Sequence, residues 1–273
     1  MSDTPQSPTA RTQTVQTHIS GQRLLPYMDE TFNDAEKAVE LYLWDRRLAT
    51  AVFHDISVLE VALRNALDRA LTQQYGPEWF RLSSALFDQR TYLQIADAWE
   101  RLPARFRDAA PGDGKIRGRL LASCMFGTWV SALDAGGKTG VDGPCAWSNH
   151  DIVWTRSMLL SAFPGAGKIA GAMRTQLTRP WVHQQVREVH ILRNRVAHHE
   201  SLINGYPVPG TGDKGSAAER RNIRAGSHAC RLLGQMLDAT LATLIEEHSQ
   251  IEAVLTADPR TDWGFAPVES RSV

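Results

Sequence analysis

Apolar residues in the first third of this chain recur at intervals of three and four, the spacing of one face of an α-helix. The first such stripe runs over residues 35–52, and Asn33 or Asp34 can cap its start. A second stripe runs over residues 56–71 behind Asp55 as an N-cap, and it ends at a Gly-Pro pair. Strand-like alternation is absent from this region. The pattern therefore predicts two successive helices here.

The same period, together with Gly and Pro breakers, predicts helices along most of the remaining chain, with boundaries good to about two to four residues. The fold class we expect is all-α, with a single multi-helix domain over residues 21–257. A disordered, flexible tail is expected at residues 1–20 and an irregular C-terminal tail at 258–273. The further predicted helices are 89–106, 115–133, 151–162, 167–178, 180–202 and 217–255.

Composition supports a globular protein, since 42% of the residues are apolar and 22% are charged, far from the signature of disorder. The 30 basic and 30 acidic residues cancel, so the whole molecule has no strong positive field to attract a polyanion. Any nucleic-acid site must therefore be a local basic patch.

Neither the cysteines nor the apolar segments indicate secretion or membrane insertion. The three cysteines are odd in number and widely separated, which fits a reducing cytosol better than a disulfide scaffold. The N-terminus lacks the apolar stretch of a signal peptide. The most apolar segment, 120–133, is shorter than the ~20 residues of a membrane-spanning helix. We expect a cytoplasmic protein without a membrane span.

The predicted helix 180–202 carries the most chemistry. His190, Asn194 and His198 are spaced by four, which places them on one stripe of a regular helix, and Arg193 borders that stripe. Arg193 and His198 are five apart, or about 140 degrees around an ideal helix. They converge only if the arginine reaches round or the helix bends.

Residues 193–199, Arg-Asn-Arg-Val-Ala-His-His, resemble the Arg-x4-6-His signature of HEPN ribonucleases in the form found in Abi-like (abortive infection) proteins. Other segments resemble landmarks of that family in the same order, so the resemblance covers about residues 41–203. They are Leu-Tyr-Leu-Trp-Asp at 41–45, Leu-Glu-Val-Ala-Leu-Arg-Asn at 59–65, Phe-Gly-Thr-Trp at 126–129, and Phe-Pro at 163–164.

The resemblance implies an endoribonuclease that needs no metal and no cofactor and leaves 2',3'-cyclic phosphate and 5'-hydroxyl ends, acting in phage defence or as a toxin. His198 suits proton transfer near neutral pH. Arg193 suits stabilisation of charge on the phosphorane, because a guanidinium binds phosphate oxygens bidentately. Asn194 would orient the histidine or the phosphate. The implied partners are RNA, a second copy of the chain, since only one full motif occurs, and a cognate antitoxin protein.

Other polar residues are accessory candidates with ordinary alternatives. His199 and His190 either assist or sit beside the site. Glu60 and Arg64 have the spacing of an exposed helical ion pair, but with Asn65 they could line the same cleft. No metal site is predicted, because His199-Glu200 lacks the second histidine of a His-Glu-x-x-His motif.

A catalytically silent, helical RNA-binding or partner-binding protein is the alternative function. Aromatic residues at helical spacing are usually core, so Phe126, Trp129 and Trp154 are expected inside rather than stacked on bases. RNA binding needs local arginines for its phosphate contacts. Candidates for these contacts are Arg187, Arg195, Arg220, Arg221 and Arg224.

Overall fold

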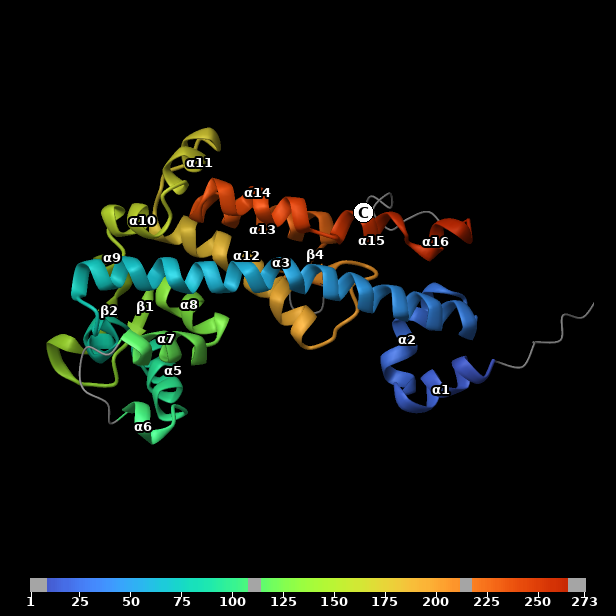
Figure 1. Ribbon diagram of the computed structural model, residues 1–273, viewed down its shortest axis with the longest axis horizontal. Coiled ribbons are helices and arrows are strands. Elements are labelled where there is room, and N and C mark those ends of the chain that lie inside the picture. Colours follow the sequence, from blue (N-terminus) through green and yellow to red (C-terminus); the bar gives the residue numbers. More distant parts are fainter. Residues whose placement is uncertain (1–8, 108–113, 212–217, 265–273) are drawn as a thin grey trace, which may run out of the picture. The chain divides into compact units, whose positions relative to one another are not determined.

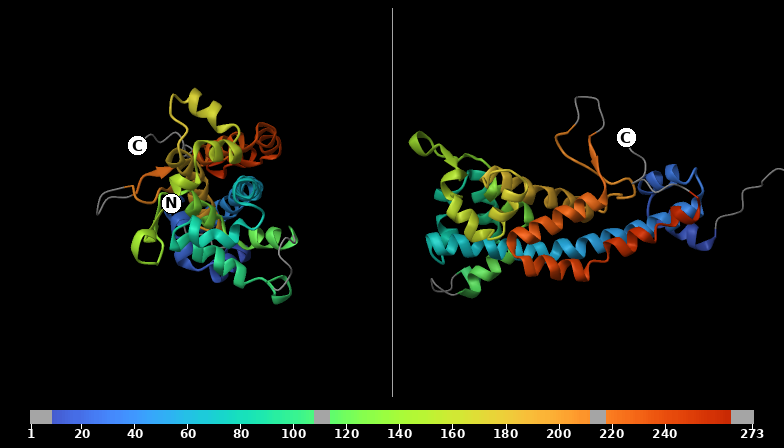
Figure 2. Two further views of the ribbon diagram at one scale, coloured as in Figure 1. Left: turned by 90° about the vertical axis from the view of Figure 1, so that its left-hand side faces the viewer. Right: turned by 90° about the horizontal axis from the view of Figure 1, so that it is seen from above.

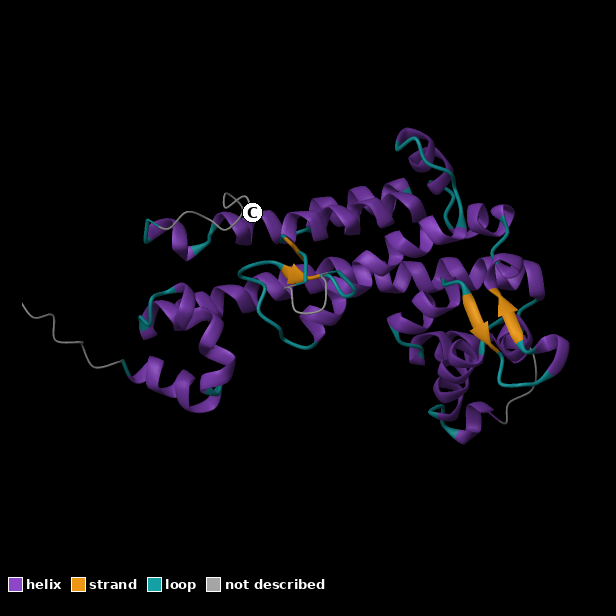
Figure 3. Ribbon diagram, turned by 180° about the vertical axis from the view of Figure 1, so that it is seen from behind, coloured by secondary structure: helices purple, strands orange, loops and turns teal. Residues whose placement is uncertain are grey.

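The computed structural model describes residues 9–107, 114–211 and 218–264, and this part of the chain is mainly α-helical (Figure 1). Its strands form two small antiparallel pairs, which Figure 3 shows in orange. In one pair, β1 (Gly136–Lys138) lies against β2 (Trp147–Asn149). In the other, β3 (Tyr206–Pro207) lies against β4 (Arg220–Arg221). The prediction of an all-α fold class is confirmed.

The described residues divide into two compact units. The first takes its residues from the ranges Met1–His54, Leu192–Ser227 and Ser249–Val273, and the second from Asp55–Ile191 and His228–His248. The helical period carries no signal of this division, because three continuous helices supply residues to both units: α3 (Ala35–Tyr75), α12 (Arg179–Ala197) and α13 (Ile223–Leu237). The expectation of one domain over 21–257 rested on that period.

Helix α3 is a single helix of 41 residues, shown in blue to cyan in Figure 2. Asp34 caps its start, since the Asp34 Oδ1 accepts hydrogen bonds from the amides of Glu36 and Lys37, each at 3.1 Å. The predicted break at Asp55 is wrong: Asp55 lies inside the helix and is buried. The apolar stripes on either side of it are in register with each other, so the helix continues through.

The first unit begins with two helices, α1 (Ala10–His18) and α2 (Gly21–Glu30). The N-cap of α1 is Thr9, whose hydroxyl accepts from the Thr12 amide at 3.4 Å, and Thr12 is buried. The structure thus differs from the tail expected over residues 1–20, because polar caps start a helix that has no marked apolar stripe. Residues 1–8 of that expected tail lie outside the described residues.

The end of the described chain also packs into the first unit, through α15 (Ile251–Thr256) and α16 (Pro259–Asp262). Arg260 is buried there: it donates to the Asp258 carboxylate, to Glu30 at 3.3 Å, and to the Ile203 carbonyl at 3.2 Å. Its guanidinium also lies 5.4 Å from the centre of the Trp44 ring. Residues 258–264 of the expected tail are therefore anchored, and 265–273 lie outside the described residues.

The second unit packs short helices around a core of aromatic side chains. Phe126, Trp129 and Trp154 are all buried, which confirms their expected place in the core. Several predicted long helices are broken here by local caps, as at Thr155, whose hydroxyl accepts from the Met158 amide. Besides parts of α3 and α12, the second unit contains these helices: η1 (Trp79–Leu82), α4 (Ser83–Leu86), α5 (Gln89–Glu100), α6 (Ala104–Arg107), α7 (Gly114–Ser123), α8 (Phe126–Leu133), η2 (Gly143–Cys145), α9 (His150–Val153), α10 (Arg156–Ala162), α11 (Ala166–Ala172), most of α13 (Ile223–Leu237) and α14 (Ala239–His248).

Length alone does not make α3 a membrane span, since it carries charged residues along its course. Among the described residues, no helix combines the length and the apolar character needed to cross a bilayer.

Candidate active site

Helix α12 ends within the Arg-Asn-x-x-Ala-His-His segment, and its apolar face is formed by buried Val182, Val186 and Val189. The helix ends at Ala197, so its predicted extension to residue 202 is wrong. The chain leaves it through a Schellman motif: the His199 amide donates to the Val196 carbonyl at 3.0 Å, and the Glu200 amide donates to the Arg195 carbonyl at 3.0 Å.

This ending changes the geometry of the candidate catalytic residues. Arg193 and Asn194 are half-buried on the last turns of the helix, whereas His198 and His199 are exposed in the turn that follows. The His198 amide still donates to the Asn194 carbonyl at 2.9 Å. His198 thus makes the last helical hydrogen bond, and the chain turns away from the helix axis directly after it.

His199 has the backbone conformation that a Schellman motif demands. Its φ is 55°, in the left-handed region that glycine usually fills at this position. A side chain in that region costs on the order of 1 kcal/mol or more, and it persists where surrounding contacts fix the backbone. The turn should therefore be held by its neighbours.

Three hydrogen bonds from distant parts of the first unit hold this turn. The Arg23 Nη1 donates to the His199 carbonyl at 2.7 Å. The Arg46 Nη2 donates to the Glu200 carbonyl at 3.0 Å. The Leu202 amide donates to the Asp45 Oδ1 at 3.0 Å. The segment that follows His198 is thus fixed by α2 and by the first half of α3.

Asp45 is the centre of this arrangement and is fully buried. Besides the Leu202 amide, its carboxylate accepts from the Tyr27 hydroxyl at 2.6 Å and pairs with the Arg46 guanidinium. Burial, followed by the charge of Asp45, raises the pKa of Tyr27, so this hydroxyl remains a neutral donor. Removing a partner of a buried charge pair is costly, because the other charge is left uncompensated.

An ion pair tightens the turn from within. The Arg195 Nη1 lies 2.8 Å from both carboxylate oxygens of Glu200. These two residues occupy the positions at which a Schellman motif commonly has a hydrophobic contact. Here a charge-assisted contact takes that place.

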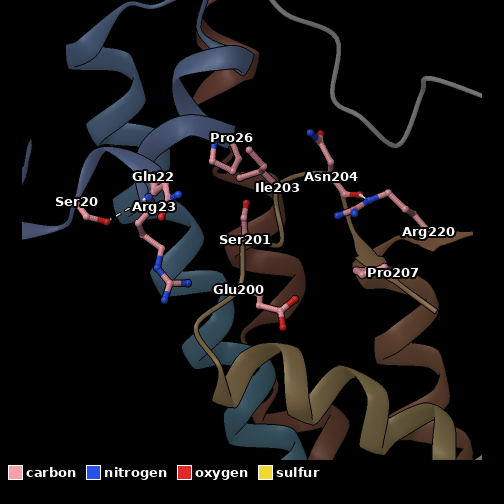
Figure 4. Close-up of a pocket in the computed structure, with 10 residues that line it drawn as sticks. All are labelled: Ser20, Gln22, Arg23, Pro26, Glu200, Ser201, Ile203, Asn204, Pro207 and Arg220. Carbon is pink, nitrogen blue, oxygen red and sulfur yellow. Dashed lines mark hydrogen bonds between the residues drawn. The ribbon is translucent and has the colours of Figure 1, made fainter. Parts of the chain in front are cut away.

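A polar pocket of about 820 Å³ opens beside the turn, and Figure 4 shows its lining. Residues on α2 form one wall, and residues after the turn together with β3 and β4 form the rest. The lining is Ser20, Gln22, Arg23, Pro26, Glu200, Ser201, Ile203, Asn204, Pro207 and Arg220.

Apart from His199, the accessory candidates belong to the second unit. His190 belongs to the second unit, where its ring stacks on Phe126 with centroids 5.4 Å apart and planes 17° apart. Glu60, Arg64 and Asn65 are also in the second unit, on α3. Of the predicted site residues, the first unit brings together the two motif positions on α12 and the two histidines of the turn.

Two features of this site were missed from the sequence. Asp45 had a detectable signal, because it lies four residues after Leu41 and three before Leu48, both fully buried, so a carboxylate stands on an apolar stripe. No sequence signal marked Arg23, because its contact with His199 joins residues 176 positions apart.

A second polar cluster holds the β1–β2 hairpin of the second unit. His150 is fully buried; its Nε2 accepts from the Asp88 amide at 3.1 Å, and its Nδ1 lies 3.3 Å from the Asp134 Oδ1. Burial by itself raises the pKa of Asp134, but hydrogen bonds from His150 and the Gly136 amide bring it below its usual value. His150 has no exposed surface, and its contacts with Asp88 and Asp134 hold the residues at the start of the hairpin.

Within the part of the chain that the structure describes, no three His, Cys, Asp or Glu side chains lie together as ligands for a metal ion. Comparison of the chain with protein-family models, with curated proteins and with solved structures finds no match.

Proposed function

We propose that this protein is an endoribonuclease of the HEPN kind, in which Arg193, Asn194 and His198 act on a phosphodiester of RNA. The observation that carries the proposal is the end of α12 at Ala197. It places His198 in the exposed turn that follows the last turns of the helix, which carry Arg193 and Asn194, and buried polar contacts through Asp45 fix that turn. A histidine on a fixed turn and a guanidinium on the preceding helix end suit phosphoryl transfer, because positioning supplies much of the catalysis.

The proposed reaction uses a nucleophile that the substrate provides. The ribose 2'-oxygen attacks the adjacent phosphorus as its proton is removed, the bond from phosphorus to the 5'-oxygen breaks, and that oxygen takes up a proton. The products are a 2',3'-cyclic phosphate and a 5'-hydroxyl. His198 transfers one of these protons, and Arg193 stabilises the charge that builds on the phosphorane.

The sequence holds one full motif, so the proposal includes a homodimer in which two copies of the α12 end face a shared substrate. A second histidine from the partner would then serve the other proton transfer. The biological role we propose, in phage defence or as a toxin held by a cognate antitoxin, rests on the resemblance of residues 41–203 to Abi-like proteins.

Cleavage should persist in EDTA, because the proposed chemistry needs only acid-base and phosphate-binding side chains. Purified protein is incubated with total RNA in excess EDTA, and the fragment ends are identified by mass spectrometry and by kinase labelling of 5'-hydroxyls. The expected result is cyclic-phosphate ends at an unchanged rate. Activity that disappears on chelation and returns with Mg²⁺ would reject this mechanism.

A further inference from the structure

Several arginines of the first unit are neutralised by carboxylates. Arg195 binds Glu200 through both carboxylate oxygens. Arg224 lies 3.1 Å from Glu252. Arg260 binds Asp258. A guanidinium that is neutralised by a carboxylate attracts an anionic ligand only weakly.

Arg23 and Arg220 are held differently, and both line the pocket beside the candidate active site. The Arg23 guanidinium donates to the His199 carbonyl, and the Arg220 guanidinium donates to the carbonyls of Asn204 at 2.8 Å and Gly205 at 2.7 Å. A carbonyl oxygen orients a guanidinium without cancelling its charge. These bonds also leave most of the five N–H donors of each arginine for a ligand.

Among the described residues that line the pocket, Glu200 is the only acidic one, and it lies near Arg220. Its carboxylate is already engaged by Arg195. Burial lowers the pKa of Arg220, and this effect outweighs the opposing influence of Glu200. Arg220 itself is exposed, so its guanidinium is accessible to a ligand that enters the pocket.

The wall that carries Arg220 is formed by backbone pairing. Gly205 has φ 67°, and a Cβ there would lie 2.1 Å from the Arg221 carbonyl, so only glycine allows β3 and β4 to approach. The pairing sets Arg220 opposite Pro207. Arg220 thus comes to the pocket already oriented.

We infer that this pocket binds a backbone phosphate of single-stranded RNA that neighbours the cleaved one, with Arg23 and Arg220 supplying the charge. The inference rests on the proposed ribonuclease function, since it takes the occupant to be the same substrate strand. The pocket begins two residues after His198, at Glu200, and its volume lies within the range of about 300–1,000 Å³ typical of ligand sites. Charge contacts of this kind read no sequence.

The inference is tested by RNA binding in a His198→Ala background, so that cleavage does not interfere. Fluorescence anisotropy with a labelled ten-nucleotide single-stranded RNA measures Kd for Arg220→Gln over a range of salt concentrations. Loss of one charge-assisted contact should raise Kd at least about tenfold. The slope of log affinity against log salt should become shallower by about 0.7, the value for one phosphate contact of a single strand. Arg47→Gln is the matched control, because Arg47 is an exposed arginine of the same unit outside this pocket.

Asn204→Asp provides a second variant that leaves the backbone anchors of Arg220 in place. It adds one negative charge to the pocket wall and should weaken RNA binding by a similar factor, whereas Gln16→Glu on exposed α1 should not. Unchanged affinity in both pocket variants would overturn the inference. So would a nucleoside monophosphate that binds as tightly as the RNA, since the pocket would then be a nucleotide site. If pocket-dependent RNA binding is found and the His198-intact protein cleaves no RNA, the ribonuclease proposal fails and the binding site stands.

Discussion

Replacing His198 with alanine should lower the rate of RNA cleavage by at least about 10²-fold, the lower end of what general acid-base catalysis contributes. His198 stands at the end of α12 in an exposed turn, and its side chain contributes to none of the hydrogen bonds that fix that turn. The loss should therefore appear in the rate and leave the fold intact. Initial rates on a fluorophore-quencher RNA measure it, with circular dichroism and light scattering to check folding and oligomeric state.

His199 provides the matched control, and glycine is the right replacement for it. Because His199 has φ 55°, alanine there would keep the backbone strain, while glycine removes the side chain and suits the left-handed conformation. We expect His199→Gly to retain most of the cleavage rate and to be at least as stable as the natural chain. An inactive His199→Gly beside an active His198→Ala would reverse the assignment. If neither variant loses activity, the silent RNA-binding function becomes the better explanation.

Replacing Asp45 with alanine should destabilise the protein by about 3–5 kcal/mol, the usual cost of breaking a buried charge pair. The substitution leaves the Arg46 guanidinium without its carboxylate, and it removes the acceptor of the Tyr27 hydroxyl and the Leu202 amide. The free energy of unfolding in urea, followed by circular dichroism, measures the effect.

Two further variants test whether the effect of Asp45→Ala comes from the lost contacts of the buried carboxylate or from a less stable helix α3. Tyr27→Phe removes one donor to Asp45 and should cost about 1–2 kcal/mol. Asp34→Ala removes the exposed N-cap of the same helix and should cost about 1 kcal/mol. If Asp45→Ala were no more destabilising than Asp34→Ala, the buried carboxylate would not be what holds the turn.

The helical period was sufficient to predict the fold class and much of the core, because burial along a helix follows local spacing. Val182, Val186 and Val189 lie four and three apart and are all buried, as expected. The same period misled at Asp55, where a polar residue between two apolar stripes resembled a cap. A helix continues through such a residue when the apolar stripes on both sides are in register. The presence of a residue that can cap a helix does not show whether they are.

The sequence by itself also determined which residues form the candidate site, since Arg193, Asn194 and His198 are neighbours along the chain. It did not determine where α12 ends. The residues from Arg193 to Ser201 include no glycine that would mark a left-handed cap, and a histidine takes that conformation only because Arg23, Arg46 and Asp45 hold the turn. Those contacts join residues more than 150 positions apart, so they come from tertiary packing and leave no periodic trace. Tertiary packing also brings Arg23 and Arg220 to one pocket. Each guanidinium is oriented there by hydrogen bonds to backbone carbonyls that are distant in sequence, and the sequence pattern does not show such contacts.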